Sequence, residues 1–158
     1  MITVWIDADS CPAPVRNYAE RRTEQIDIRL KFVANRELTV KKSDKIEFIV
    51  SRPGKDSADN IIYENVQDND LVITRDLLFA DRLVRRHIAV MNDSGTVFSA
   101  GDMEILLAER ELSLQLAEAG IVKKTRRKHN PGNMERFRAN FDRMTGKLLD
   151  AAQSGYST

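Results

Sequence analysis

Short apolar runs alternate along this chain with segments in which apolar residues recur every three or four positions. Runs rich in β-branched and aromatic residues predict strands, at residues 2–6, 26–33, 48–50, 71–74 and 88–91. The three-to-four periodicity predicts helices, at residues 14–25, 56–67, 77–86, 102–119 and 133–151. Residues 38–45 fit neither pattern. Regular alternation of strands and helices predicts an α/β fold with a mostly parallel sheet covered on both faces.

Acidic residues follow three of the predicted strands. Asp7 and Asp9 come directly after the first strand, Asp56 and Asp59 open the helix after the third, and Asp76 follows the fourth. Right-handed crossovers bring the carboxyl ends of parallel strands to one edge of the sheet, and ligands bind there where the strand order reverses. We therefore expect at least four carboxylates to meet at that edge.

Clustered carboxylates repel one another unless a cation neutralises them, and oxygen ligands select hard cations such as Mg²⁺ or Mn²⁺. Such an ion activates water and offsets charge during phosphodiester hydrolysis. The predicted metal ligands are Asp7, Asp56, Asp59 and Asp76. The predicted catalytic residues are Asp7, Asp9, Asp59 and Asp76, with Ser10, Asn60, Thr74 and Asp81 in supporting positions.

A purely structural interpretation of the same acids stays open. Asp and Asn are frequent helix caps and turn formers, because their side chains accept hydrogen bonds from nearby backbone N–H groups. Asp56 fits a cap of the helix that it opens, and Asp81 and Asp93 fit solvated or turn positions. Cys11, close to the acids, is expected to be a small packed side chain, since neighbouring carboxylates disfavour a thiolate.

The net charge of +1 conceals an asymmetry between the two parts of the chain. Residues 1–120 hold 16 Lys and Arg against 21 Asp and Glu, whereas residues 121–158 hold 9 against 3. Cations near an acidic metal site help to hold a polyanion. The predicted phosphate contacts are Lys55, Arg75, Lys123, Lys124, Arg126, Arg127 and Lys128, and the predicted partner is a nucleic acid, foremost RNA. A solvated charged loop is the alternative interpretation of residues 123–128.

Length and composition exclude several classes. The 158 residues are expected to form a single domain, with a basic loop at 121–132 and a C-terminal helix at 133–151. No stretch approaches the ~20 apolar residues that cross a bilayer, and the first residues do not have the pattern expected of a secretory signal. One cysteine permits neither an internal disulfide nor a cysteine zinc cage, so a cytoplasmic location is expected. The last two helices fit packing on the sheet or on another copy, which leaves a homo-oligomer open.

Five motifs together resemble the YaiI/YqxD family of small bacterial proteins. They run in order from about residue 2 to residue 141, as "WIDADSCP", "VAN", "DSADNIIYENV", "DLVITRDLLFADRLV" and "MNDSG". The family's sequence pattern is similar to that of PIN-like domains, which are metal-dependent ribonucleases. The resemblance implies a three-layer α/β/α PIN-like sandwich and a suspected nuclease activity.

The resemblance also assigns roles to individual residues. Asp7 and Asp9 match the first acidic strand end, Asp56 and Asp59 the acids of the middle helix, and Asp76 the acid after the "ITxD" strand. PIN nucleases often have one further acid beyond this point, for which Asp81 and Asp93 are the nearest residues. The family usually has a Pro-Leu pair where this chain has Leu78 and Phe79, a difference that suggests packing and not chemistry.

Three functions are compatible with these residues. The first is a Mg²⁺- or Mn²⁺-dependent nuclease that hydrolyses RNA or another phosphodiester. The second is a non-catalytic module that binds nucleic acid or protein. The third is a phosphatase of the haloacid-dehalogenase type, in which the first acid of "DAD" is the nucleophile and the second is the acid/base.

Overall fold

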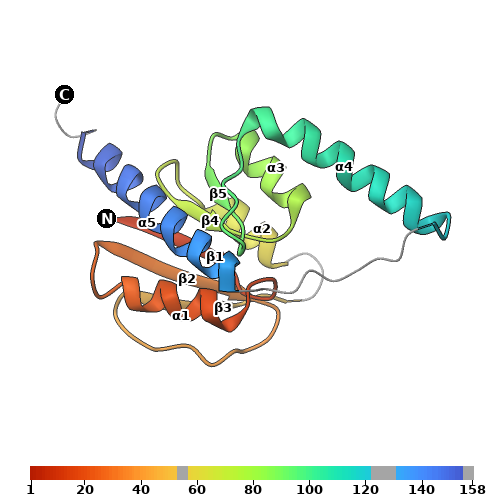
Figure 1. Ribbon diagram of the computed structural model, residues 1–158. Helices are drawn as coiled ribbons and strands as arrows, with labels where there is room; N and C mark the ends of the chain where they lie inside the picture. Colours follow the sequence, from red (N-terminus) through yellow and green to blue (C-terminus); the bar gives the residue numbers. More distant parts are fainter. Residues whose placement is uncertain (53–56, 122–130, 155–158) are drawn as a thin grey trace.

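A five-stranded parallel sheet forms the centre of the protein (Figure 1). The computed structural model describes residues 1–52, 57–121 and 131–154. The order of the strands is β3-β2-β1-β4-β5, and every neighbouring pair is parallel. The strands are β1 (Ile2–Asp7), β2 (Ile28–Ala34), β3 (Ile46–Val50), β4 (Leu71–Ile73) and β5 (Ala89–Met91). The predicted α/β fold is confirmed.

Five helices connect and follow the strands within the described ranges, namely α1 (Ala13–Arg22), α2 (Ala58–Asn65), α3 (Leu77–Arg85), α4 (Ala100–Glu118) and α5 (Pro131–Ser154). Several predicted boundaries were wrong by two or three residues; for example, α1 ends at Arg22 and not at 25, and β3 begins at Ile46 and not at 48. The N-cap of α2 is Ser57, whereas Asp56 lies outside the described residues. Helix α5 begins at Pro131, inside the predicted loop, because proline is favoured in a first helical turn, where its missing N–H costs nothing.

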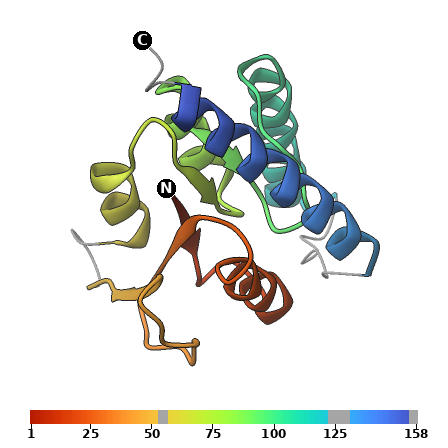
Figure 2. The same cartoon turned by 90° about the vertical axis from the view of Figure 1, so that its left-hand side faces the viewer.

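Each face of the sheet packs against its own layer of helices. Val4 and Ile6 of β1 join a core with residues of α1 and α5, whereas Trp5 between them points to a second core with residues of α2 and α3. Side chains of a strand alternate between its two faces, so β1 contributes to both cores. Figure 2 shows α1 and α2 on opposite sides of the sheet. The architecture is a three-layer sandwich.

Residues 35–45 form the crossover from β2 to β3 without a helix. Leu38 and Val40 of this crossover segment pack against the core to which α1 also contributes. The Lys45 ammonium donates hydrogen bonds to the carbonyls of Thr23 (2.6 Å) and Ile26 (2.9 Å), just beyond the end of α1. A cation on carbonyls at a helix C-terminus offsets their partial negative charge.

The last two helices are placed differently. Phe137 and Phe141 of α5 are fully buried against the sheet and α1. Helix α4 packs on α3 and buries Met103, whereas Ile105 and Leu112 are exposed, and Figure 1 shows it extending away from the sheet. Within the described ranges no helix has both the length and the apolar character to span a membrane. The cytoplasmic location and the homo-oligomer stay predictions.

Candidate functional site

The strand order reverses between β1 and β4. The chain runs outward from β1 through β2 to β3 and then returns to β4 on the other side of β1. The crevice outside the carboxyl ends of two such strands is the usual ligand site of a parallel sheet. Here β1 ends in Asp7, and β4 is followed by Thr74, Arg75 and Asp76.

A chain of hydrogen bonds joins the ends of these two strands. The buried Thr74 hydroxyl donates to Asp7 Oδ2 at 3.1 Å and accepts the backbone N–H of Asp76 at 3.1 Å. The Ser10 hydroxyl donates to the Asp7 carbonyl at 3.1 Å and accepts the Arg75 N–H at 3.2 Å. The predicted supporting residues Ser10 and Thr74 thus hold the two strand ends in register.

Burial raises the pKa of Asp7 from 3.8 to about 6. Hydrogen bonds from Thr74 and Ser10 oppose this rise, whereas the negative charges of Asp9 and Asp76 add to it. Desolvation and like charges both disfavour a carboxylate, so a cation placed here would relieve both. Asp7 is therefore the residue at this edge whose electrostatics most favour a bound cation.

Asp9 turns away from Asp7 toward β2. Its Oδ2 accepts the backbone N–H of Asn35 at 2.7 Å, directly after the end of that strand. Asp76 has a comparable structural bond, because its Oδ1 accepts the N–H groups of Leu78 (3.0 Å) and Phe79 (3.2 Å) and so caps α3. Within the described part of the chain, Asp76 Oδ2 has no hydrogen-bond partner, and it lies on an exposed residue.

Asp59 lies in the first turn of α2, at the same sheet edge by topology. Its Oδ1 accepts the Ser57 hydroxyl at 2.5 Å and the Asn60 N–H at 2.9 Å, so its bonds in the structure are local. The described ranges contain no group of three or more Asp, Glu, His or Cys side chains placed to hold a metal ion. Asp56 lies outside them. A metal site that includes Asp59 stays a prediction.

Arg75 and Asp93 form an ion pair beside Asp76. Arg75 Nη2 lies 2.6 Å from Asp93 Oδ2, and Nε lies 3.3 Å from Oδ1. The Asp93 side chain is 4% exposed, whereas that of Arg75 is 47% exposed. The bond to Asp93 raises the pKa of Arg75. The guanidinium is fixed on one side by a buried carboxylate and faces solvent on the other.

The loop that carries Asp93 is held from both sides. Within the loop, Asn92 Oδ1 accepts the N–H groups of Ser94 and Thr96. From α5, Arg136 donates to the Ser94 carbonyl at 2.8 Å and Asn140 donates to the Gly95 carbonyl at 2.5 Å. The positioning of Arg75 by Asp93 was missed in the sequence, where Asp93 was assigned to a solvated or turn position and named as one of two nearest residues for a further PIN-type acid. The turn motif "NDSG", which follows β5, was the only sequence signal that could have placed Asp93 near the end of β4.

Asp81 and Cys11 complete the predicted residues that the structure describes. Asp81 on α3 forms an i,i+4 ion pair with Arg85, its Oδ2 3.0 Å from Arg85 Nε. Cys11 is buried as expected, and burial together with the charges of Asp7 and Asp93 raises the pKa of its thiol. Seven predicted residues lie outside the described ranges, namely Lys55, Asp56, Lys123, Lys124, Arg126, Arg127 and Lys128.

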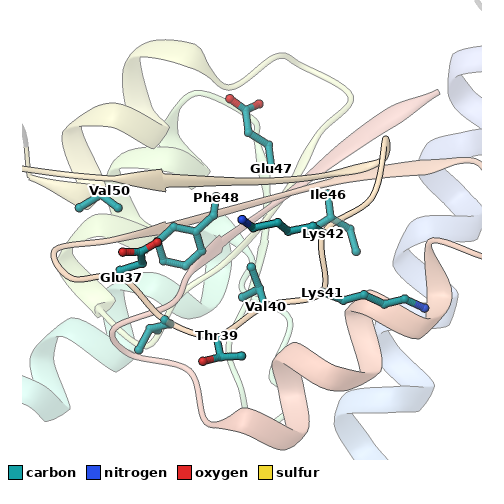
Figure 3. Close-up of a pocket in the computed structure, with 10 residues that line it drawn as sticks. Glu37, Thr39, Val40, Lys41, Lys42, Ile46, Glu47, Phe48 and Val50 are labelled. Carbon is teal, nitrogen blue, oxygen red and sulfur yellow. The ribbon is translucent and has the colours of Figure 1, made fainter.

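A pocket of about 740 Å³ lies elsewhere, between the crossover segment and the edge strand β3 (Figure 3). Its lining combines apolar Val40 and Phe48 with two glutamates and two lysines, Glu37, Glu47, Lys41 and Lys42. None of the predicted catalytic or metal-binding residues lines it. The balanced charges give it no preference for an anion or a cation.

Comparison with known proteins identifies relatives over nearly the whole chain. The sequence pattern described as "Uncharacterized BCR, YaiI/YqxD family" matches residues 5–147. A UPF0178 protein of Treponema pallidum is 33% identical over 152 residues, which cover 96% of this chain and 86% of the relative. A UPF0178 protein of Psychromonas ingrahamii is 34% identical over 146 residues, covering 92% of this chain and 97% of the relative.

A third UPF0178 protein, from Mesorhizobium japonicum, is 31% identical over 153 residues, which cover 97% of this chain and 97% of the relative. No solved structure gives a significant match. The resemblance of the five sequence motifs and the match over residues 5–147 agree. The chain therefore belongs to the YaiI/YqxD family.

Proposed function

We propose that this protein is a Mg²⁺- or Mn²⁺-dependent nuclease that hydrolyses RNA or another phosphodiester at the ends of β1 and β4. The observation that carries the proposal is the half-buried Asp7 at the point of strand reversal, with a pKa raised to about 6 and hydrogen-bonded to Thr74. A desolvated carboxylate beside two other acids is costly for a fold, and such a cost is typical of functional sites.

The donor set fits a magnesium-type ion better than an ion enclosed by protein ligands. Mg²⁺ is commonly held by one or two carboxylates together with substrate phosphates, and keeps several waters. Asp7 and the uncommitted Oδ2 of Asp76 would supply two carboxylates, with Asp59 and Asp56 as further candidates. When bound, the ion supplies a Lewis acid and lowers the pKa of a water that attacks phosphorus.

The other residues have roles that follow from their contacts. Thr74 holds the Asp7 carboxylate and the Asp76 backbone, so it sets the separation of the two acids. The exposed side of the Arg75 guanidinium is suited to a phosphate oxygen, because Arg binds phosphate through parallel N–H donors. Asp93 fixes that guanidinium, which reduces the ordering cost when the substrate binds.

A haloacid-dehalogenase-type phosphatase is the weaker alternative. That mechanism requires the second acid of "DAD" to reach the leaving-group oxygen beside the first. Asp9 instead accepts the Asn35 N–H at the end of β2. Its direction therefore favours the nuclease over the phosphatase.

A non-catalytic nucleic-acid-binding module is the second candidate. It is favoured by the lack, within the described ranges, of three metal-ligating side chains grouped around one point. In that case the acids at the strand ends serve as caps and loop ties, as Asp9 and Asp76 do. Binding of RNA without cleavage would distinguish this module from a nuclease.

The decisive experiment incubates the purified full chain with labelled single-stranded RNA in Mn²⁺, in Mg²⁺ and in EDTA. We expect cleavage that needs the metal and that falls by at least about 100-fold in Asp7→Asn and in Asp76→Asn. Asparagine keeps the hydrogen bonds that Asp7 accepts from Thr74 and that Asp76 accepts as the cap of α3, so both variants should fold.

The matched control is Asp68→Asn, which removes an exposed carboxylate near the amino end of β4, at the opposite edge of the sheet. Its cleavage rate should equal that of the wild type. Cleavage in EDTA, or full activity in Asp7→Asn, would refute the proposal. Absence of cleavage by the wild type on RNA and on DNA would also refute it, and the binding module would then be preferred.

A further inference from the structure

A second pocket, of about 380 Å³, lies between the end of α1 and the middle of α5. It is lined by Tyr18, Arg21, Arg22, Gln25 and Arg138. Its volume is within the range of small-molecule sites, about 300–1,000 Å³. Three of its five lining residues are arginines, so the pocket has an unusually positive lining.

The three arginines and Tyr18 line the same pocket. The Arg21 guanidinium lies over the Tyr18 ring, 5.7 Å from its centroid. Burial and the hydrogen bond to Asp142 raise the pKa of the Tyr18 hydroxyl, and the positive charges of Arg22 and Arg138 oppose that rise. Tyr18 is itself fixed by edge contacts with Phe137 and Phe141, at centroid distances of 6.2 and 5.7 Å.

Protein carboxylates neutralise only part of this charge. Asp142 accepts the Tyr18 hydroxyl at 2.8 Å and pairs with Arg22 Nε at 3.1 Å. Arg21 and Arg138 form no salt bridge with any residue in the described ranges. Two unpaired guanidiniums close to a third are mutually repulsive, and a bound anion would remove that repulsion.

Stabilisation of helix α1 does not explain the whole cluster. Basic residues in the last turn of a helix offset its dipole, which would account for Arg21 and Arg22. However, Lys45 already occupies the carbonyls of Thr23 and Ile26 just beyond that end. Arg138 belongs to the middle of α5 and has no helix end to stabilise.

We infer that this pocket is a phosphate-binding site. Phosphate is the anion suggested by several guanidiniums from different elements, because planar N–H forks match phosphate oxygens in pairs. Gln25 adds a polar lining group, and its Oε1 accepts a hydrogen bond from Arg22 Nη1 at 2.5 Å. The bound group is either a free phosphate or a phosphate of a nucleic-acid chain.

The pocket is separate from the strand ends that hold Asp7. Helix α1 begins six residues after the end of β1 and its ten residues span about 15 Å, with the pocket at its far end. A single-stranded nucleic acid several nucleotides long would reach both places. The inference does not depend on the proposed nuclease, since phosphate binding needs neither the acids nor a metal.

Binding is tested by titration calorimetry of the full chain in EDTA, once with inorganic phosphate and once with a ten-nucleotide oligouridylate. Wild type should bind at least one of them, and Arg21→Gln/Arg138→Gln should lose about tenfold in affinity for each guanidinium removed. Arg21→Lys/Arg138→Lys keeps the charge and loses the paired geometry, so its affinity should lie between the two. Binding of inorganic phosphate indicates a free anion, and binding of the oligouridylate alone indicates a nucleic-acid chain.

The matched control is Arg110→Gln/Arg143→Gln, which removes two exposed arginines from α4 and α5 outside the pocket. Its affinity should stay within about twofold of the wild type at 0.15 M salt, where distant charges are screened. Equal losses in the pocket and control variants, or no binding of either ligand by the wild type, would overturn the inference.

Discussion

Replacing Asp7 by asparagine should make this protein more stable at neutral pH, although it removes a predicted catalytic group. The folded state holds the pKa of Asp7 at about 6, against a usual value of 3.8, chiefly because the carboxylate is desolvated. That difference corresponds to about 3 kcal/mol of unfavourable free energy once the carboxylate is ionised. Asparagine has nearly the same shape, carries no charge and still accepts the Thr74 hydroxyl.

The sign follows from proton binding. Between pH 3.8 and about 6 the folded Asp7 keeps a proton that the unfolded chain has lost, so its contribution to stability falls as the pH rises through this window. Below it both states are protonated and the penalty disappears. We therefore expect the stability advantage of Asp7→Asn to be near zero at pH 3.5 and to approach 2 to 3 kcal/mol at pH 8.

The assay is urea unfolding of the wild type and the variant in EDTA at several pH values from 3.5 to 8, comparing differences at each pH. Asp68→Asn, which removes an exposed carboxylate, is the control, and its difference from the wild type should be small and nearly constant. A difference for Asp7→Asn that does not change with pH would refute the reasoning. So would a variant that is less stable than the wild type at pH 8.

Two further predictions concern the framework of the fold. Gly95 has φ +88°, and a Cβ there would lie 2.6 Å from the Arg136 carbonyl carbon and Phe137 nitrogen, so Gly95→Ala should destabilise the fold by about 2–4 kcal/mol. The control is Gly146→Ala, on α5 with open space around it, which should be neutral or stabilise by up to about 1 kcal/mol in urea unfolding. Equal changes in unfolding free energy for the two variants would contradict the close contact at Gly95. Buried Asp70 accepts the Thr3 N–H, the Trp5 indole N–H and the Gln67 N–H. Asp70→Ala should therefore lower the free energy of unfolding in urea by about 2–4 kcal/mol, and Asp70→Asn by clearly less. An unchanged urea midpoint for Asp70→Ala would contradict this structural role.

The loop at residues 92–96 connects the last helix with the candidate site. Arg136 and Asn140 of α5 donate to carbonyls of this loop, while its Asp93 holds Arg75 at the end of β4. The close approach of Gly95 to α5 makes this contact possible, because any side chain there would meet backbone atoms. Helix α5 therefore contributes to the position of Arg75 without touching it.

The sequence by itself determined the elements of the fold and which of them carry acids. Apolar runs and helical periodicity depend on local spacing, so the five strands and five helices of the described ranges were predictable to within a few residues. The parallel arrangement followed from their alternation, and it placed Asp7 and Asp76 at one edge of the sheet. These features depend on neighbours in the chain.

Only the tertiary structure decided what each acid contacts. Asp7 and Asp9 are two residues apart, yet the first accepts a bond from Thr74 after β4 and the second from Asn35 after β2, because β1 lies between those two strands. The pairing of Asp93 with Arg75 likewise requires β5 to lie beside β4. Such partners are set by strand order and by burial, which are properties of the whole packed chain and not of any local pattern.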